Sequence, residues 1–378
     1  MKLFFWQNIN SIHQSAFFSA LVNVEGIEVT LIVTEKISEF RLGMGWELPA
    51  IEGLSVIELI EEDSGWQDLI NLNSNNNVLH VFSGINAFPK VHNAFLHAIK
   101  KGCKVGVFTE PLDFRGLKGF LRNLRGYYYS LKYQKKIALV LVTGKLGYKQ
   151  FKNWGYNESK LFEWSYTVEK SVNEIKESAI YKNPLFKIMF AGSLIPRKGY
   201  DILIDALKIN KASGLRFQAD FYCLQENELE IAEKIKKDSD LGLEINLLPF
   251  LPNKELRKQI NGYDLFILPS RHDGWGAVIN ESLSEGTPVV VSSKCGSSTL
   301  INNSFLGNTI DVLDKNKLAE TLSFYIRKGK LDYAERLQVR EWYDTNVSGE
   351  SLVKYFMDVL GFINNVKIES KPIVPWER

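Results

Sequence analysis

The stretch Asp264–Val291, DLFILPSRHDGWGAVINESLSEGTPVVV, contains the pattern that decides the fold. The apolar run Leu265–Leu268 predicts a buried strand, and a turn and an acidic loop follow it. A helix is expected over about Ala277–Gly286, because Pro288 forbids its continuation. The β-branched run Val289–Val291 predicts a second strand. The stretch therefore predicts a strand–loop–helix–strand unit.

Two carboxylates lie in this unit, Asp273 in the loop and Glu281 about one turn into the helix. Gly274 and Gly276 flank Trp275, and glycines without Cβ let a phosphate approach the free amides of a helix N-terminus. A carboxylate is poorly placed to hold phosphate, but it accepts hydrogen bonds from sugar hydroxyls. The unit therefore predicts a nucleotide-sugar site, with the diphosphate at the helix end and hydroxyl-bearing rings on either side.

This pattern resembles the signature of retaining glycosyltransferases of family 4, which have the GT-B fold. That signature has two acids separated by seven residues around a Gly-aromatic-Gly loop, followed by a small-Gly-x-Pro-Val-Val segment. The resemblance implies that Asp273 contacts the donor sugar, that Glu281 holds the ribose, and that the loop Gly274–Trp275–Gly276 binds the donor. The family usually has Glu at the first position, so Asp273 is a departure. An ordinary buried βαβ unit with incidental acids is the alternative.

A second part of the predicted site is FAGSLIPRKG, residues 190–199. Arg197 and Lys198 precede a glycine and a predicted helix start, and two adjacent cations there can clamp a diphosphate. The segment is also similar to the family's Gly-x-Leu-x-x-x-Lys-Gly element, although Ser193 stands where many relatives carry Arg. The alternative is a solvent-exposed pair at a helix start.

Three further residues are candidates for the site. The resemblance places the backbone near Leu251 beside the nucleotide base. Glu110 stands where the family often has a His facing the acceptor, and it either contacts the donor sugar, contacts the acceptor or caps a loop. His13, in the first loop, is expected to line the cleft, whereas His80 lies on a predicted strand and is expected to be a core residue.

No metal or other cofactor is expected beyond the nucleotide-sugar, which is a substrate. Residues 238–240 match the Asp-x-Asp pattern of metal-dependent glycosyltransferases, but they lie in a polar turn and are taken as a chance match. The three cysteines are far apart in sequence and form neither a disulfide framework nor a metal cluster, which fits a reducing cytosol. A net charge of +2 implies no nucleic-acid partner.

Strand and helix patterns alternate in both halves of the 378 residues, which predicts an α/β protein with parallel sheets. By resemblance the fold is GT-B, two Rossmann-like domains whose sheets face a central cleft. We expect an acceptor-binding domain over residues 1–172, a linker over 173–184 and a nucleotide-sugar domain over 185–347. Residues 348–378 are expected to cross back to the first domain, with an irregular tail.

The segment Phe114–Lys136 interleaves basic residues with leucines and aromatic residues, and Leu117, Leu121 and Leu124 recur at helical spacing. Such a helix can lie in an anionic membrane interface. The alternative is a solvated helix packed on its own domain. No signal peptide and no apolar run of transmembrane length are expected, so we predict a cytoplasmic protein at the inner face of the cell membrane.

The sequence thus predicts a metal-independent retaining glycosyltransferase. Its donor is expected to be a UDP-sugar, and its acceptor a hydroxyl of a glycan or a polyprenyl- or lipid-linked intermediate of bacterial surface polysaccharide or lipopolysaccharide. The alternative is a non-catalytic nucleotide-sugar-binding or membrane-scaffold protein of the same fold.

Overall fold

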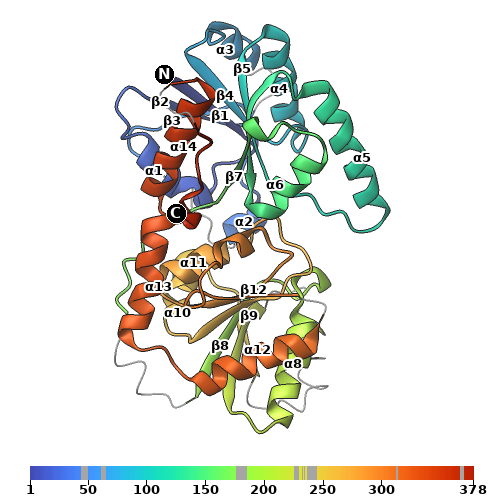
Figure 1. Cartoon of the computed structure of the whole chain (residues 1–378), viewed down its shortest axis with the longest axis vertical. Coiled ribbons are helices and arrows are strands. Elements are labelled where there is room, and N and C mark those ends of the chain that lie inside the picture. The colour runs from blue at the N-terminus through green and yellow to red at the C-terminus, as the bar shows by residue number, and fades with distance from the viewer. Residues whose placement is uncertain are drawn as a thin grey trace. The chain divides into compact units, whose positions relative to one another are not determined.

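The computed structural model describes most of the chain: residues 1–43, 50–60, 65–175, 185–224, 245–311, 314–366 and 370–378, with Glu230, Ile231, Glu233 and Ile235. The chain divides into two compact units (Figure 1). The first comprises Met1–Leu42, Glu47–Glu169 and Asn346–Arg378, and the second is mainly Lys170–Thr345. The expected linker falls mostly on residues 176–184, which lie outside the described residues, as does the Asp-x-Asp match at 238–240.

The first unit is a seven-stranded parallel sheet in the order β3-β2-β1-β4-β5-β6-β7. Its strands are β1 Lys2–Gln7, β2 Glu28–Val33, β3 Ser55–Glu58, β4 Val78–Ser83, β5 Lys104–Thr109, β6 Ile137–Thr143 and β7 Leu161–Trp164. Its helices are α1 Ser15–Leu21, α2 Glu39–Gly43, α3 Trp66–Leu72, α4 Pro89–Lys101, α5 Gly116–Tyr133, α6 Gly144–Asn153 and α14 Gly349–Ile363. Short 3₁₀ turns are η1 Ile12–Gln14, η2 Glu158–Lys160 and η7 Pro375–Glu377.

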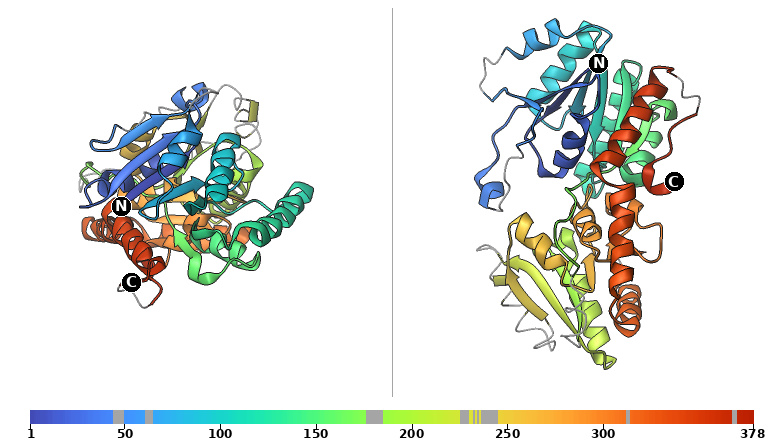
Figure 2. Two further views of the ribbon diagram at one scale, coloured as in Figure 1. Left: turned by 90° about the horizontal axis from the view of Figure 1, so that it is seen from above. Right: turned by 90° about the vertical axis from the view of Figure 1, so that its left-hand side faces the viewer.

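Both faces of this sheet are covered by helices, as Figure 2 shows. Along β1 the side chains alternate: Phe4 and Trp6 join the core beneath α4, whereas Phe5 contacts the rings of Phe18 on α1 and Phe356 on α14. Burial on two faces explains why β1 is apolar at almost every position. The close packing of α14 on α1 ties the C-terminal segment to the first unit.

The second unit is a six-stranded parallel sheet in the order β10-β9-β8-β11-β12-β13. Its strands are β8 Phe186–Ala191, β9 Phe217–Leu224, β10 Ile245–Pro249, β11 Leu265–Leu268, β12 Val289–Ser292 and β13 Gly307–Ile310. Its helices include α8 Tyr200–Ala212, α10 Asn253–Ile260, α11 Val278–Ser284, α12 Lys315–Lys328 and α13 Tyr333–Asn346, with 3₁₀ turns η3 Pro196–Lys198 and η6 Gly296–Leu300.

The predicted α/β class with two parallel sheets is confirmed. The strand–loop–helix–strand unit is present as β11, α11 and β12. His80 is a core residue, as expected: it is fully buried, accepts from the Trp6 indole N–H at 3.1 Å and lies 2.9 Å from the Asn73 carbonyl. The short strands β3, β7 and β13 escaped prediction, because each mixes polar and apolar residues over four positions and lacks the continuous apolar run of β11.

The C-terminal tail was expected to be irregular, and apart from the turn η7 residues 371–378 have no regular secondary structure. The tail is nevertheless packed, because Trp376 is buried at 2% exposure. Arg378 pairs with Asp358 of α14 at 3.1 Å, and Lys371 donates to the Tyr148 hydroxyl on α6 at 3.0 Å. The tail therefore belongs to the packed first unit, since one large apolar side chain anchors it.

Candidate functional site

The candidate site in the second unit lies where the strand order reverses. The chain builds β8, β9 and β10 outward on one side and then returns to add β11 on the other side of β8. Loops that follow two such neighbouring parallel strands diverge and leave a ligand-binding crevice at the carboxyl ends of the strands. The turn η3 with Arg197 and Lys198 follows β8, and the loop with Asp273 follows β11.

At this point an ion pair joins the two predicted halves of the site. The Lys198 ammonium donates to Asp273 Oδ2 at 2.7 Å. A guanidinium nitrogen of Arg197 lies 3.9 Å from the same oxygen and donates to the His272 carbonyl at 3.2 Å. The side chains of Lys198 and Asp273 are 20% and 14% exposed, so the pair is largely desolvated yet still reachable. Two cations thus converge on one carboxylate.

The backbone of the Asp273 loop is held by the segment after β12. Asp273 N–H donates to the Lys294 carbonyl at 3.1 Å, and the Asp273 carbonyl accepts from Gly296 at 3.2 Å. Gly276 has φ of +89°, and a Cβ there would lie 2.6 Å from Leu268 Cδ2. Only glycine fits this close, left-handed position without strain, so the loop keeps one conformation.

Arg271 connects the loop after β11 to α8 and to the turn after β8, a role that the sequence did not indicate. Its guanidinium donates two hydrogen bonds to the Asp201 carboxylate on α8, at 2.7 and 2.6 Å. The backbone N–H of Arg271 donates to the Arg197 carbonyl at 2.8 Å. Burial raises the pKa of Asp201, but the bonds and charge of Arg271 bring it below its ordinary value. The loop after β11 and the turn after β8 are therefore locked together. The sequence showed one Arg, Arg271, within the stretch Asp264–Val291, but it did not indicate the partner Asp201, which lies 70 residues away.

Glu281 lies on α11, where it is 3% exposed. Its Oε1 accepts from the Asn253 amide at 2.6 Å. Burial raises the pKa of Glu281 above its ordinary value, the charge of Arg257 and the bond from Asn253 oppose this, and Glu285 adds to it. The carboxylate is thus buried on α11 and has a partner supplied by α10.

The assignment of Trp275 needs correction. Its ring is 1% exposed and its indole N–H donates to Asn280 at 2.6 Å, so this side chain is part of the core and only backbone is left for a ligand. Burial follows from the glycines on either side, which let the loop fold back and turn the ring inward. Gly274 lies within the same loop, and Leu251 is half-buried between β10 and α10.

In the first unit, Glu110 and His13 are both neighbours of Tyr166. The Tyr166 hydroxyl donates to Glu110 Oε1 at 2.6 Å, and the rings of Tyr166 and His13 are 6.1 Å apart. Burial, with the charge of Arg41, lowers the pKa of His13 to about 4, so its imidazole is neutral at pH 7. Glu110 is therefore held by a side chain that sequence reasoning did not identify.

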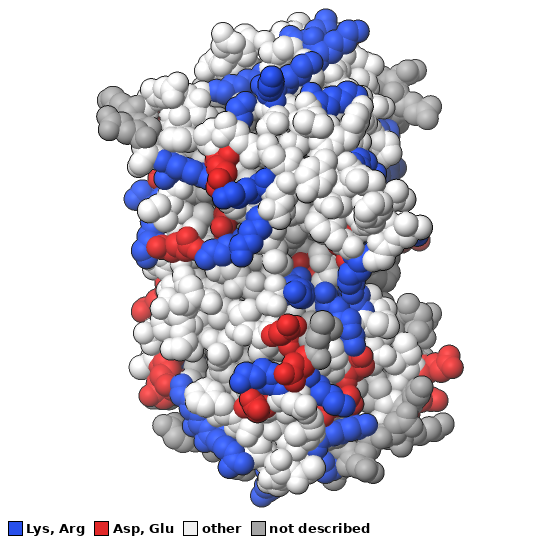
Figure 3. Space-filling model, turned by 45° about the vertical axis from the view of Figure 1, so that its right-hand side comes forward, with Lys and Arg blue, Asp and Glu red and all other residues white. Residues whose placement is uncertain are grey.

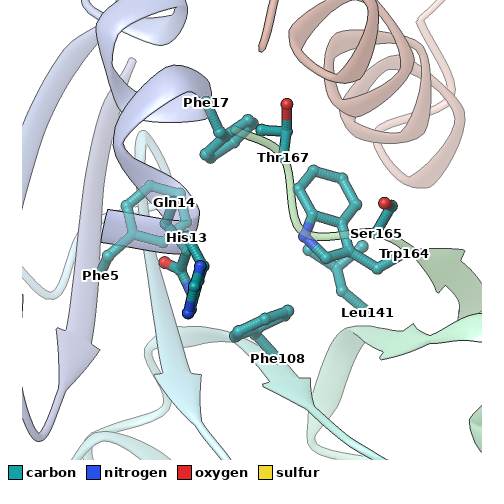
Figure 4. A pocket seen from close by; sticks show the side chains of 9 residues that line it. All are labelled: Phe5, His13, Gln14, Phe17, Phe108, Leu141, Trp164, Ser165 and Thr167. Atoms are coloured by element: carbon teal, nitrogen blue, oxygen red, sulfur yellow. The ribbon is translucent and has the colours of Figure 1, made fainter. Parts of the chain in front are cut away.

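A small cavity adjoins these residues, with a volume of about 20 Å³. Nine side chains line it, among them His13, Phe108 and Trp164, and Figure 4 shows them around it. This volume holds about one water molecule or methyl group. The cavity is lined mostly by rings, so it suits a small apolar group rather than a charged one.

Among the described residues, no group of three His, Cys, Asp or Glu side chains comes close enough to hold a metal ion. Within the same residues, no helix is long and apolar enough to span a bilayer.

Sequence comparison matches residues 171–339 to the model of the family "Glycosyl transferases group 1". Two curated relatives illustrate the sequence identity and the coverage of these matches. An uncharacterized 41.2 kDa protein in the cps region of Klebsiella pneumoniae is 24% identical over 40% of this chain and 39% of its own length. The UDP-Gal:alpha-D-GlcNAc-diphosphoundecaprenol alpha-1,3-galactosyltransferase of Escherichia coli is 27% identical over 39% of each chain. The match thus spans less than half the length of these curated relatives.

Comparison with solved structures extends over both units. The structure of Anabaena Alr3699/HepE in complex with UDP aligns with a TM-score of 0.70 and 13% identity, covering 96% of this chain and 100% of that one. This likeness shows the fold, which is GT-B.

Proposed function

We propose that this protein is a retaining glycosyltransferase that moves a sugar from a UDP-sugar to a hydroxyl of a glycan or lipid-linked acceptor. The observation that carries the proposal is the convergence of Lys198, Arg197 and Asp273 at the strand-order reversal of the second unit. That unit lies in the region matched to the glycosyltransferase family. UDP is favoured because a structure with the same fold binds UDP, and a relative uses UDP-galactose by name.

In this proposal the ion pair separates when the donor binds. The diphosphate takes over Lys198 and Arg197, which neutralise charge as it leaves, the task that a metal performs in other enzymes. Asp273 is released to accept hydrogen bonds from the donor sugar and so holds the anomeric carbon in place. The backbone of Gly274 and Gly276 lets the donor approach closely. The acceptor hydroxyl then attacks from the leaving-group side and passes its proton to the departing phosphate, so no protein nucleophile and no metal is needed.

The ribose and base have their own proposed contacts. Glu281 accepts hydrogen bonds from the ribose hydroxyls, and backbone groups near Leu251 contact the uracil edge. In the first unit, Glu110 and His13 are proposed to contact the acceptor. A carboxylate fixed by Tyr166 accepts hydrogen bonds from sugar hydroxyls, and a neutral imidazole adds no charge to such a contact.

The acceptor is proposed to be held at an anionic membrane, reached through α5. The helix packs inward with its small residues Gly119, Gly126 and Ser130, so its leucines point away from the core. The exposed apolar and aromatic side chains of the segment are Phe114, Leu117, Phe120, Leu121, Leu124, Tyr127, Tyr128 and Leu131. The exposed basic ones are Arg115, Lys118, Arg125, Lys132, Lys135 and Lys136.

This mixture of groups suits a lipid headgroup layer. Rings and leucines enter the interface while ammonium and guanidinium groups meet anionic lipids. Blue and uncoloured side chains predominate on the face of the first unit that carries α5 (Figure 3). The diphosphoundecaprenol named for the Escherichia coli relative is a lipid-linked acceptor of the proposed kind. On this basis we place the enzyme at the inner face of the cell membrane, acting in surface polysaccharide or lipopolysaccharide synthesis.

The test combines binding and turnover. Purified protein is melted with UDP, GDP and ADP, with and without EDTA, and then given radiolabelled UDP-sugars with membrane extract as acceptor. We expect UDP alone to raise the melting temperature, EDTA to leave that rise unchanged, and label to enter the lipid fraction.

Asp273→Ala should lower the rate of sugar transfer about a hundredfold or more, because the hydroxyls of the donor sugar lose the carboxylate that accepts their hydrogen bonds. Asp205→Ala is the matched control, since it removes an exposed carboxylate paired with Lys315 at 3.2 Å in the same unit. Equal activity of Asp273→Ala and wild type, or no shift with any nucleotide, would support a non-catalytic scaffold instead.

A further inference from the structure

The helices α10 and α11 are joined by two side-chain pairs with the same spacing. Asn253 of α10 donates to Glu281 of α11 at 2.6 Å, and Arg257 of α10 donates to Glu285 of α11 at 3.0 Å. Residues four apart lie on one face of a helix, so the two pairs are stacked one turn apart. The first pair ends on the carboxylate proposed to hold the ribose.

The second pair is anchored from several sides. Glu285 is fully buried, and besides Arg257 it accepts from Ser171 at 2.6 Å and from Asn173 at 3.0 Å. Arg257 also donates to the Ser284 hydroxyl at 3.2 Å. The guanidinium therefore has little freedom, and its positive charge stays near enough to Glu281 to favour the ionised form of that carboxyl group.

The first pair has a different character, because Glu281 is buried without a direct ion pair. Burial raises the pKa of Glu281, and the neighbouring Glu285 raises it as well. Arg257 and the Asn253 bond act in the opposite direction, since both favour the ionised form. Among the described residues, these are the groups on α10 and α11 that face the carboxylate.

Asn253 is also placed to connect two parts of the nucleotide. It begins α10 directly after Leu251 and Pro252, the segment proposed to pass beside the base. Its amide occupies Oε1 of Glu281 and leaves Oε2 as an acceptor. A carboxyl group that is fixed in this way presents its remaining lone pairs in one direction.

We propose that Asn253 is a positioning residue for ribose recognition, which holds the Glu281 carboxyl group in the orientation that accepts the ribose hydroxyls. Arg257, fixed by Glu285, supplies the opposite charge. This inference rests on the proposed role of Glu281 and adds to it a residue that determines selectivity for a ribose over a sugar without hydroxyls.

The test measures the dissociation constants of UDP and 2′,3′-dideoxyuridine diphosphate by calorimetry, for the whole protein between pH 5 and pH 8. Wild type should prefer UDP. Asn253→Ala should weaken the binding of UDP about fivefold to tenfold, because contacts to the ribose hydroxyls are lost. The dissociation constant of the dideoxy compound should stay almost unchanged, since it makes no such contacts. The acid-side loss of UDP affinity should move to higher pH, since the ionised form of Glu281 loses a hydrogen bond.

Two variants separate this inference from the proposed function. Glu281→Gln tests the ribose contact itself, and Asn246→Ala removes an amide–carboxylate bond of 2.7 Å to Asp220 elsewhere in the unit. Asn246→Ala should leave the UDP preference and its pH dependence as in wild type. If Glu281→Gln removes the preference while Asn253→Ala keeps it with an unchanged pH dependence, the role of Asn253 is wrong and the donor site stands. If Glu281→Gln keeps the preference, or wild type does not bind UDP, both proposals are wrong.

Discussion

Asp273 and Glu281 each accept a hydrogen bond from the chain itself, Asp273 from Lys198 and Glu281 from Asn253. Each carboxylate therefore has a partner that a ligand must replace or join. The two differ in how they are stabilised, because Asp273 has two cations nearby while Glu281 depends on an amide and on Arg257 at a distance. A buried carboxylate without a direct ion pair, such as that of Glu281, lowers the folding stability when it is ionised.

This cost predicts a stabilising substitution. The folded-state pKa of Glu281 is raised above its ordinary value of 4.5, so the stability linked to it is present at low pH and is lost as pH rises through the folded pKa. Glu281→Gln, whose amide oxygen can still accept from Asn253, should raise the melting temperature by about 1–3 °C at pH 8. Near pH 4 the gain should vanish, because the wild-type carboxyl is then protonated.

Thermal melts of both proteins across this pH range check the expectation. Asp205→Asn is a suitable control, since its carboxylate is exposed and carries no such cost. A gain of the same size at pH 4 and pH 8 would contradict the electrostatic origin. Weaker UDP binding by the stabilised variant would indicate that the charge is kept for function.

At the scale of elements, α5 stands at the periphery of the first unit (Figure 1). Its buried residues are the small Gly119, Gly126 and Ser130 together with Tyr133. A Cβ on Gly126 would lie 2.1 Å from the Trp154 ring, whose indole N–H donates to Asn123 at 2.7 Å. Close approach through glycine leaves no room on that face for leucines. The apolar side chains are therefore outside, where Leu117 and Leu131 are 76% and 82% exposed.

Gly126→Ala should lower the free energy of unfolding by about 1–3 kcal/mol, because the methyl group overlaps the Trp154 ring. Leu124→Ala, two positions away on the outer face, should change it by less than about 0.5 kcal/mol. Denaturant unfolding of the two variants makes the comparison. A similar loss from both would mean that the leucine face is covered by protein.

Leu121→Glu combined with Leu124→Glu should reduce binding to vesicles that contain anionic lipid about tenfold or more, because two leucines no longer enter the interface. The melting temperature should stay close to that of wild type, since both side chains are more than half exposed. Leu72→Glu on α3 is the matched control, because Leu72 is 81% exposed on another helix. Vesicle flotation at low and high salt is the measurement, and equal flotation of all three proteins would exclude α5 as the contact.

At the scale of the whole molecule, the first unit is assembled from segments far apart in the sequence. Gly349 at the start of α14 lies so close to α1 that a Cβ would be 2.0 Å from the Ala16 carbonyl oxygen. On α14, the ring of Phe356 contacts that of Phe17, and the ring of Tyr355 contacts that of Trp164. A face of the first sheet is therefore covered by a helix that lies far from α1 in the sequence.

The two units should consequently differ as isolated fragments. A fragment of residues 1–169 lacks α14 and exposes the ring cluster around Phe17, so it should aggregate or unfold without a cooperative transition. A fragment of residues 170–345 contains its complete sheet and should unfold cooperatively. Circular dichroism during urea titration distinguishes them. A cooperative transition of the first fragment with the stability of the whole protein would show that α14 is dispensable.

Local pattern was sufficient for much of this protein. The run from Leu265 to Val291 predicted β11, α11 and β12, because four-residue apolar strands, a stop at Gly286 and Pro288 are all local signals. The helix α5 was likewise predicted from the helical spacing of Leu117, Leu121 and Leu124. Arg197, Lys198 and Asp273 were selected from residue type and neighbouring glycines, and they do lie together.

Tertiary structure decided the rest, because contacts between distant residues leave no local trace. The partners Asn253 for Glu281, Asp201 for Arg271 and Tyr166 for Glu110 follow only from which strands are neighbours. The burial of Trp275 and Trp376 depends on whether other segments cover them, and aromatic residues occur on surfaces as well as in cores. Sequence thus determined most of the elements that form and brought out the residues that we propose carry the chemistry. Packing determined which of those side chains a ligand can reach and which other side chains hold them.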